Sequence, residues 1–172
     1  MAKERFLLDT NSFVTPYLSF YPFDFAPAYW EQLESILIHD EVFLLDSVVD
    51  EIVKGDDDLT NWLKDVEGIR IIRRQDSKII EAYQKVLQII QDSPYYTDRA
   101  LRKWSAASVA DPWLIAAASV YGQVIVTFEK SSGKIASGSP SSNPKIPDIA
   151  REMDVRCEDL YYFMRNEGIH FG

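Results

Sequence analysis

Short apolar runs separated by helical patterns are the feature that most limits how this chain can fold. Each run predicts a strand, and three of them are almost wholly apolar, as strands buried on both faces of a sheet are. The predicted strands are Arg5–Leu8, Val42–Leu45, Ile69–Arg73, Gln123–Thr127 and a weaker Val155–Cys157. Because helical patterns lie between them, the order indicates βαβ units and a parallel sheet. With right-handed crossovers, this predicts an α/β fold, a three-layer α/β/α sandwich.

Apolar residues at three- and four-residue steps predict the helices between these strands. The clearest is Lys78–Gln91, which Pro94 ends, and the others are Ala28–Ile38, Ser47–Val53, Leu59–Val66, Asp111–Tyr121 and Glu158–Asn166. Two segments are irregular. Pro16–Pro27 is rich in aromatic residues and proline, which predicts a packed loop or a broken helix. Ser131–Pro144 is rich in Ser, Gly and Pro, which predicts a mobile surface loop.

Length and composition predict one globular domain over residues 1–172. The chain has 172 residues and is 47% hydrophobic, enough to bury a full core. No apolar stretch approaches the length of a membrane span, and Met1–Arg5 leads straight into the first strand, so we expect no signal peptide. Cys157 is the only cysteine, so no internal disulfide can form. These features favour a cytoplasmic protein without a membrane partner.

The formal net charge of −9 limits how the chain can meet nucleic acid. An acidic protein repels phosphates over most of its surface, which counts against a non-specific DNA-binding module. A nuclease stays open, because a bound metal and local basic residues can reverse the field at one site.

Four acids stand where a sheet would bring them near one edge. Asp9 directly follows the first buried run, at the strand exit where open α/β folds bind ligands. Glu51 lies about one turn into the helix after the second strand, Asp111 opens a late helix, and Glu129 comes two residues beyond a buried strand. We therefore predict that Asp9, Glu51, Asp111 and Glu129 converge on one cleft.

Taken singly, each of these acids also has an ordinary structural explanation. Asp9 could be a turn or cap residue before a helix that starts near Phe13. A helix dipole favours an acid at Glu51. Asp111 followed by Pro112 suits an N-cap with proline at the first helical position. The case for a site therefore rests on the combination.

Carboxylates without His or Cys favour Mg²⁺ or Mn²⁺ over structural zinc. The two histidines, His39 and His170, lie far from these positions in sequence. Close carboxylates raise one another's pKa values, so a cation would keep them ionised. Such a centre activates water and stabilises charge on a phosphodiester. The fourth ligand stays open between Glu129 and Asp148, which could instead cap the helix after Pro147.

Other catalytic schemes find less support in the residues. The sequence contains no Gly-Lys-Ser/Thr phosphate loop, no Gly-x-Gly-x-x-Gly and no Gly-x-Ser-x-Gly elbow. Cys157 has no obvious His partner. A phosphatase on another doubly wound fold would carry an Asp-x-Asp nucleophile motif, but position 11 is Asn.

Four short motifs follow one another along almost the whole chain, with Glu51 between the first two. They are Asp9-Thr10-Asn11-Ser12-Phe13, Asp111-Pro112-Trp113, Thr127-Phe128-Glu129 and Lys145-Ile146-Pro147-Asp148. Their order and spacing resemble the PIN-domain family of metal-dependent ribonucleases, and more closely an uncharacterised prokaryotic PIN-like subfamily. The resemblance implies a parallel sheet with strand order 3-2-1-4-5 and an acidic pocket at the strand ends that holds Mg²⁺ or Mn²⁺.

The resemblance also implies roles and partners. Asp9, Glu51 and Asp111 would hold the metal directly or through water, with Glu129 as fourth acid, and Asn11, Thr127 and Asp148 would give polar support. The implied reaction is hydrolysis of RNA phosphodiester bonds. Many relatives are toxins of toxin–antitoxin pairs, silenced by a small antitoxin, and many form homodimers.

The chain departs from the family pattern in three ways, and the first of these departures, together with the acidic surface, motivates a second hypothesis. Glu129 stands where Asp is common, and the loop Ser131–Pro144 is long. Pro16–Pro27 is an added segment whose aromatics could stack bases of single-stranded RNA or simply pack over a helix. The leading hypothesis is a Mg²⁺- or Mn²⁺-dependent endoribonuclease that acts as a toxin. The alternative is a catalytically inactive PIN-like protein-interaction module.

Overall fold

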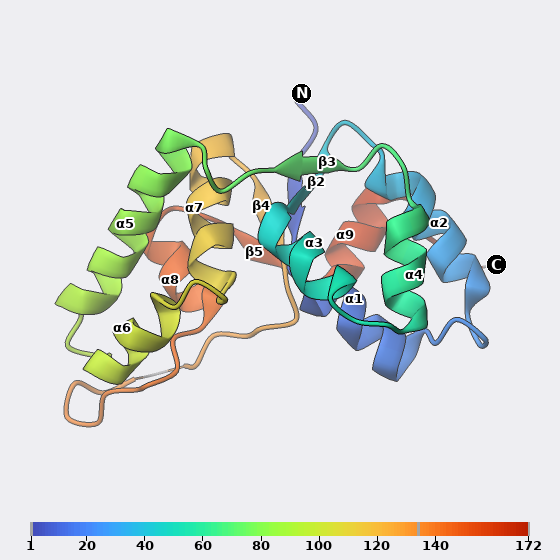
Figure 1. Ribbon diagram of the computed structural model, residues 1–172. Coiled ribbons are helices and arrows are strands. Elements are labelled where there is room, and N and C mark those ends of the chain that lie inside the picture. Colours follow the sequence, from blue (N-terminus) through green and yellow to red (C-terminus); the bar gives the residue numbers. More distant parts are fainter. Residues whose placement is uncertain (1, 134, 172) are drawn as a thin grey trace. The chain divides into compact units, whose positions relative to one another are not determined.

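A parallel sheet with helices between its strands forms the framework of the fold (Figure 1). The computed structural model describes residues 2–133 and 135–171, so Lys134 of the predicted mobile loop lies outside the described residues. Within these ranges, five strands have the order β3-β2-β1-β4-β5. They are β1 (Phe6–Leu8), β2 (Val42–Leu45), β3 (Arg70–Ile72), β4 (Val124–Val126) and β5 (Cys157–Glu158). The order and the flanking helices confirm the predicted α/β fold.

The strands form where the sequence is apolar on both faces. β1 and β4 are buried at every position, and β2 at all but Phe43. In the parallel register Leu8 of β1 lies beside Leu44 of β2. The last strand differs from prediction, because pairing begins only at Cys157, after the buried Val155. Ile125 N donates to Arg156 O and Thr127 N to Glu158 O, so ladder contacts flank this short strand.

The helices predicted from apolar spacing are all present, with ends shifted by at most two residues. They are α2 (Pro27–Leu37), α3 (Asp46–Val53), α4 (Asp58–Asp65), α5 (Ser77–Asp92), α7 (Asp111–Tyr121) and α9 (Leu160–Glu167). The structure also contains α1 (Asn11–Thr15) and α8 (Ile146–Glu152), close to the helix starts considered near Phe13 and after Pro147. It adds a π-helix η1 (Pro16–Phe20) and α6 (Asp98–Trp104). The segment Pro16–Pro27 thus follows the broken-helix alternative.

Two predicted helix starts need correction. Asp111 is not the N-cap of α7, because Ala110 occupies that position and Asp111 is the first helical residue. Helix α3 begins at Asp46 instead of Ser47, and the Asp46 carboxylate accepts a hydrogen bond from Ser47 N at 2.8 Å. In both cases an acid in the first turn meets the positive end of the helix dipole.

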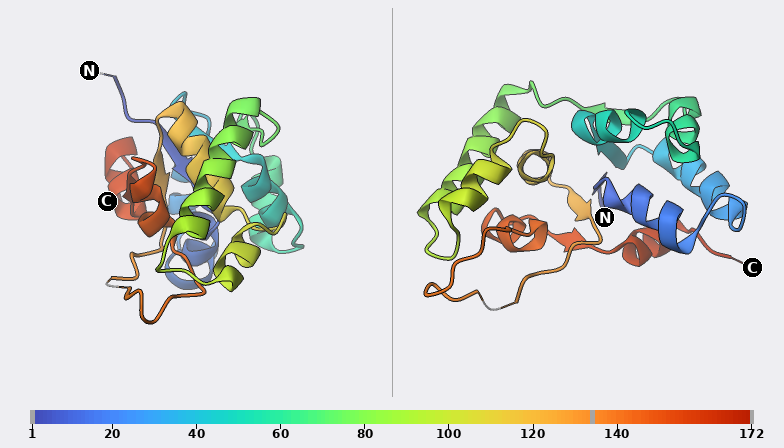
Figure 2. Two further views of the ribbon diagram at one scale, coloured as in Figure 1. Left: turned by 90° about the vertical axis from the view of Figure 1, so that its left-hand side faces the viewer. Right: turned by 60° about the horizontal axis from the view of Figure 1, so that its bottom comes forward.

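The chain divides into two compact units, each described here by itself. The first unit comprises Met1–Arg73, Val126–Phe128 and Glu158–Gly172, and the second comprises Arg74–Ile125 and Glu129–Cys157. In the first unit, Phe6 and Phe163 pack edge to face at 5.2 Å in a core with Leu33 and Leu44. In the second unit, α5 and α7 lie side by side, as both Figure 1 and Figure 2 show. No helix among residues 2–133 and 135–171 has the length and apolar character that crossing a membrane requires.

Candidate active site

Asp9 is a buried carboxylate at the exit of β1. Asp9 as a whole is only 5% exposed, and Asp9 N donates a hydrogen bond to Val126 O of β4 at 2.9 Å. A carboxyl group so far removed from water needs hydrogen-bond partners close by. Thr127, which follows β4 and is 3% exposed, supplies one, because its Oγ1 donates to Asp9 Oδ2 at 2.8 Å.

Asn11 orients this hydroxyl and ties it to the backbone. Its Nδ2 donates to Thr127 Oγ1 at 3.2 Å, and its Oδ1 accepts from Phe128 N at 3.0 Å. The Thr127 hydroxyl can therefore accept from Asn11 while it donates to Asp9, and a hydrogen bond to a carboxylate is stronger than one between neutral groups. Ser12 adds a further link, since its Oγ donates to Val126 O at 2.8 Å. We call Asp9, Asn11 and Thr127 the polar triad.

Glu51 reaches the same end of the first unit from α3. Its Oε2 accepts from Thr10 Oγ1 at 2.7 Å, so it contacts the residue next to Asp9 although its own side chain is largely exposed. Because β1 and β2 are neighbours in the sheet, the turn from β2 into α3 lies at the edge where Asp9 stands.

Asp46 is an acid at this edge that the sequence reasoning missed. It directly follows β2 and is half-buried, and the register of Leu8 with Leu44 places it near the exit of β1. The signal was available, because an acid immediately after a buried strand is the same pattern that singled out Asp9.

Asp111 and Glu129 belong to the second unit. Asp111 is half-buried in the first turn of α7. Glu129 contacts the start of α8, where its Oε2 accepts from Ile146 N at 2.8 Å and its Oε1 lies 3.9 Å from Lys145 Nζ. The Glu129 carboxylate therefore satisfies a backbone donor at a helix N-terminus.

Asp148 holds the long loop that precedes α8. Its carboxylate accepts hydrogen bonds from Ser131 Oγ and from Ser132 N, and Arg151 Nη2 lies 3.7 Å away. Burial raises the pKa of the Asp148 carboxyl, but these hydrogen bonds and the nearby guanidinium outweigh burial, so the pKa lies below its ordinary value.

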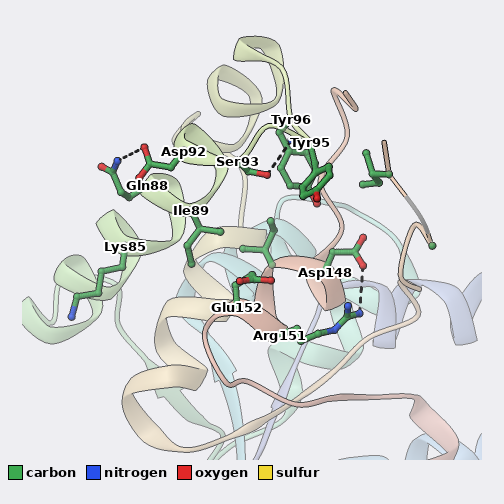
Figure 3. Close-up of a pocket in the computed structure, with 13 residues that line it drawn as sticks. Lys85, Gln88, Ile89, Asp92, Ser93, Tyr95, Tyr96, Asp148, Arg151 and Glu152 are labelled. Atoms are coloured by element: carbon green, nitrogen blue, oxygen red, sulfur yellow. Dashed lines mark hydrogen bonds and ion pairs between the residues drawn. The ribbon is translucent and has the colours of Figure 1, made fainter. Parts of the chain in front are cut away.

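The side chain of Asp148 also borders a cavity of about 580 Å³ in the second unit. Figure 3 shows Asp148 and Arg151 pointing toward each other on one side and Tyr95 and Tyr96 close by. Ile89 is one of the apolar side chains that line this cavity, and both acidic and basic side chains line it as well.

The structure thus brings together part of the predicted set. Asp9, Asn11 and Thr127 contact one another, and Glu51 contacts the adjacent Thr10. In the part of the chain that the structure describes, no group of three or more His, Cys, Asp or Glu side chains forms a metal cluster. The ligand roles of the acids stay a prediction.

Comparison with known families finds one match that covers nearly the whole sequence. Residues 6–171 match the family described as "Domain of unknown function (DUF4411)". No curated protein matches the chain. Because the match extends over far more than half of the residues, the chain belongs to the DUF4411 family.

Proposed function

We propose that this member of the DUF4411 family is a Mg²⁺- or Mn²⁺-dependent endoribonuclease that hydrolyses RNA phosphodiester bonds. The observation that carries the proposal is the buried Asp9 carboxylate at the exit of β1, held by the Thr127 hydroxyl and through it by Asn11. The resemblance to PIN domains supports the same assignment.

The residues present suit a hard divalent cation, because the donors are carboxylate oxygens. Asp9 and Glu51 would hold the ion, with Asp111 and Glu129 as the further ligands that the sequence pattern assigns. When bound, such an ion would supply an activated water and would stabilise charge on the phosphate.

Within the polar triad, Asn11 and Thr127 orient the Asp9 carboxylate for this role before any ion binds. The Nδ2 of Asn11 points a donor at Thr127 Oγ1, which leaves the hydroxyl proton directed at Asp9 Oδ2. The Thr10 hydroxyl likewise donates a hydrogen bond to Glu51 Oε2. Both carboxylates are thus held in place by neutral donors, which orient a ligand without cancelling its charge.

Single-turnover cleavage of RNA with Mn²⁺ tests the proposal. We expect Asp9→Asn and Asp111→Asn each to lower the cleavage rate by at least about 100-fold. Mutation of a residue that only supports a metal ligand already lowers metal affinity or activity by about 10- to 100-fold. Asp24→Asn, which removes an exposed acid of the first unit, serves as the control and should cleave like the parent. Equal rates in all four proteins would reject the assignment.

The remaining parts of the proposal rest on the resemblance. We propose a single PIN-like domain over residues 1–172 that acts in the cytoplasm as the toxin of a toxin–antitoxin pair and forms a homodimer. A short neighbouring gene whose product binds this chain and blocks RNA cleavage would support the toxin role. A neighbourhood without such a gene, together with cleavage that does not slow growth on expression, would contradict it.

A second candidate is a PIN-like module that has lost catalysis and binds another protein. The contacts of Glu129 favour it, because this carboxylate caps α8 and lies near Lys145, as a structural residue would. Titration calorimetry with Mn²⁺ separates the two. A folded protein that binds no Mn²⁺ would favour the module, whereas binding that Asp9→Asn removes would favour the nuclease.

A further inference from the structure

An exposed aromatic ring stands next to the polar triad. Phe20, the last residue of η1, is 45% exposed and stacks on Phe128 with ring centroids 6.0 Å apart and planes inclined by 22°. Phe128 directly follows Thr127, and its backbone N donates to Asn11 Oδ1. Asn11 therefore contacts both the backbone of Phe128 and the Thr127 hydroxyl that donates to Asp9.

The other rings of Pro16–Pro27 that make close stacks face the interior of the first unit. Phe23 stacks on Trp30 at 4.3 Å, and Tyr21 stacks on Tyr29 at 4.4 Å. These two rings pack against α2. Phe20 differs, because its stacking partner belongs to the loop after β4 and nearly half of its own surface stays in contact with solvent.

Phe20 ends a π-helical turn. Pro16 follows α1 directly, and the wider π-helical turn is closed by a hydrogen bond from Tyr21 N to Pro16 O at 2.7 Å. Leu18 and Phe20 then project to the surface, with Leu18 69% exposed. Single π-helical turns are rare and occur frequently at functional sites.

We propose that the exposed face of Phe20, backed by Phe128, stacks an unpaired nucleobase of single-stranded RNA beside the Asp9 site. This inference rests on the proposed function, which makes RNA the substrate. Every nucleotide of RNA carries a base beside its phosphate. Unpaired bases stack on aromatic side chains, whereas the bases of a duplex are already stacked and paired.

The charge of the first unit favours stacking as the contact with RNA. The unit contains 18 acidic and 7 basic residues, a formal charge of −11, whereas the second contains 9 and 11. Phosphate contacts can add little affinity on so acidic a unit. A flat apolar ring binds a base without needing positive charge, and its contribution should change little with salt.

The experiment measures how tightly the protein binds a short fluorescent single-stranded RNA, with Ca²⁺ in place of the Mn²⁺ of the cleavage assay. The variants are Phe20→Ala and Phe20→Tyr, with Phe25→Ala and Leu18→Ala as controls, since these side chains are exposed on the same segment (80% and 69%). We expect Phe20→Ala to bind about tenfold more weakly, the magnitude of one base–aromatic stack. Phe20→Tyr should bind like the parent because the ring is kept, and both controls should also bind like the parent. Circular dichroism confirms folding of each variant.

Several outcomes would overturn the inference. Parent-like binding by Phe20→Ala would do so, as would a parent that binds no single-stranded RNA. An equal loss in Phe20→Ala, Phe25→Ala and Leu18→Ala, accompanied by a change in oligomeric state, would identify a protein interface instead. If Asp9→Asn abolishes Mn²⁺-dependent cleavage while Phe20→Ala binds RNA normally, the stacking site alone fails. If the parent binds RNA through Phe20 but does not cleave it, the nuclease assignment fails and the stacking site stands.

Discussion

Replacing Thr127 by valine tests whether the polar triad stabilises the buried acid. Valine has nearly the same shape as threonine, so the change removes the hydroxyl and leaves the packing around it almost intact. The carboxylate of Asp9 loses a donor at 2.8 Å, and Asn11 Nδ2 loses its acceptor at 3.2 Å. Because Asp9 and Thr127 are buried, water cannot readily replace either contact.

The expected magnitude follows from these contacts. A hydrogen bond to a charged group contributes about 1.5–3 kcal/mol to the free energy of unfolding. The methyl group that replaces the hydroxyl is buried, which offsets this loss by about 0.8 kcal/mol. Thr127→Val should therefore lower the free energy of unfolding by about 1–2 kcal/mol, a drop in Tm of about 2–8 °C for a chain of this size.

A double-mutant cycle in urea isolates the bond from other effects of the substitution. The cycle comprises the parent, Thr127→Val, Asp9→Ala and the double variant, with unchanged m-values as the check on two-state unfolding. We expect a coupling free energy of about 1.5–3 kcal/mol, because the hydroxyl stabilises the fold only when the carboxylate is present. If Thr127→Val costs the same with and without the Asp9 carboxylate, the reasoning is refuted.

Three further predictions follow from individual contacts. The lowered pKa of Asp148 means that its contribution to stability is fully present above its unfolded pKa of about 3.9 and is lost as pH falls through the lower folded value. Unfolding curves of the parent and Asp148→Asn should therefore differ at neutral pH, begin to approach each other as pH falls below about 4, and converge only below the folded pKa. A hydrogen bond from the Tyr121 hydroxyl is the main reason that the pKa of Asp76 is lowered, so NMR titration of Tyr121→Phe should show that pKa rising. Asp57→Ala should destabilise the protein by about 1 kcal/mol in urea because it removes the side-chain cap of α4, whereas Asp56→Ala, outside the helix, should change little.

The buried strands and the amphipathic helices were predictable because their residues repeat with one clear period. A run such as Phe6–Leu8 or Val124–Val126 has no polar position that could face water, so it belongs between two layers. Helix α5 shows the 3.6-residue pattern over its full length. The strand order was available only through the resemblance, since periodicity says nothing about which strands are neighbours.

Elements with few buried residues were harder to predict. Helix α6 buries only Ala100 and Trp104, so its apolar period is too short to stand out, although the Thr97 side chain caps it by accepting a hydrogen bond from Ala100 N. The π-helical turn was not predictable either, because Pro16 was compatible with a loop as well as with a distorted helix.

Within the candidate site, the sequence indicated residue types better than contacts. Asn11 and Thr127 were predicted to support the metal ligands, but the order of hydrogen bonds between them depends on side-chain geometry across 116 residues of chain. The contacts of Glu129 and Asp148 with α8 and its preceding loop were equally hidden, because an irregular loop has no period from which to infer its path.

The first unit is assembled from three stretches that lie far apart in the chain, and this has a consequence for protein synthesis. A ribosome delivers residues 2–73 long before Thr127, and Thr127 before Phe163, whose ring packs on Phe6. During that interval β1 carries an acid without its hydroxyl donor and an apolar core without its last helix. Long-range contacts of this kind slow folding and leave apolar strands exposed to aggregation. The nascent chain should therefore depend on chaperones until residues 158–171 have left the ribosome, and fragments that stop before this stretch should be insoluble.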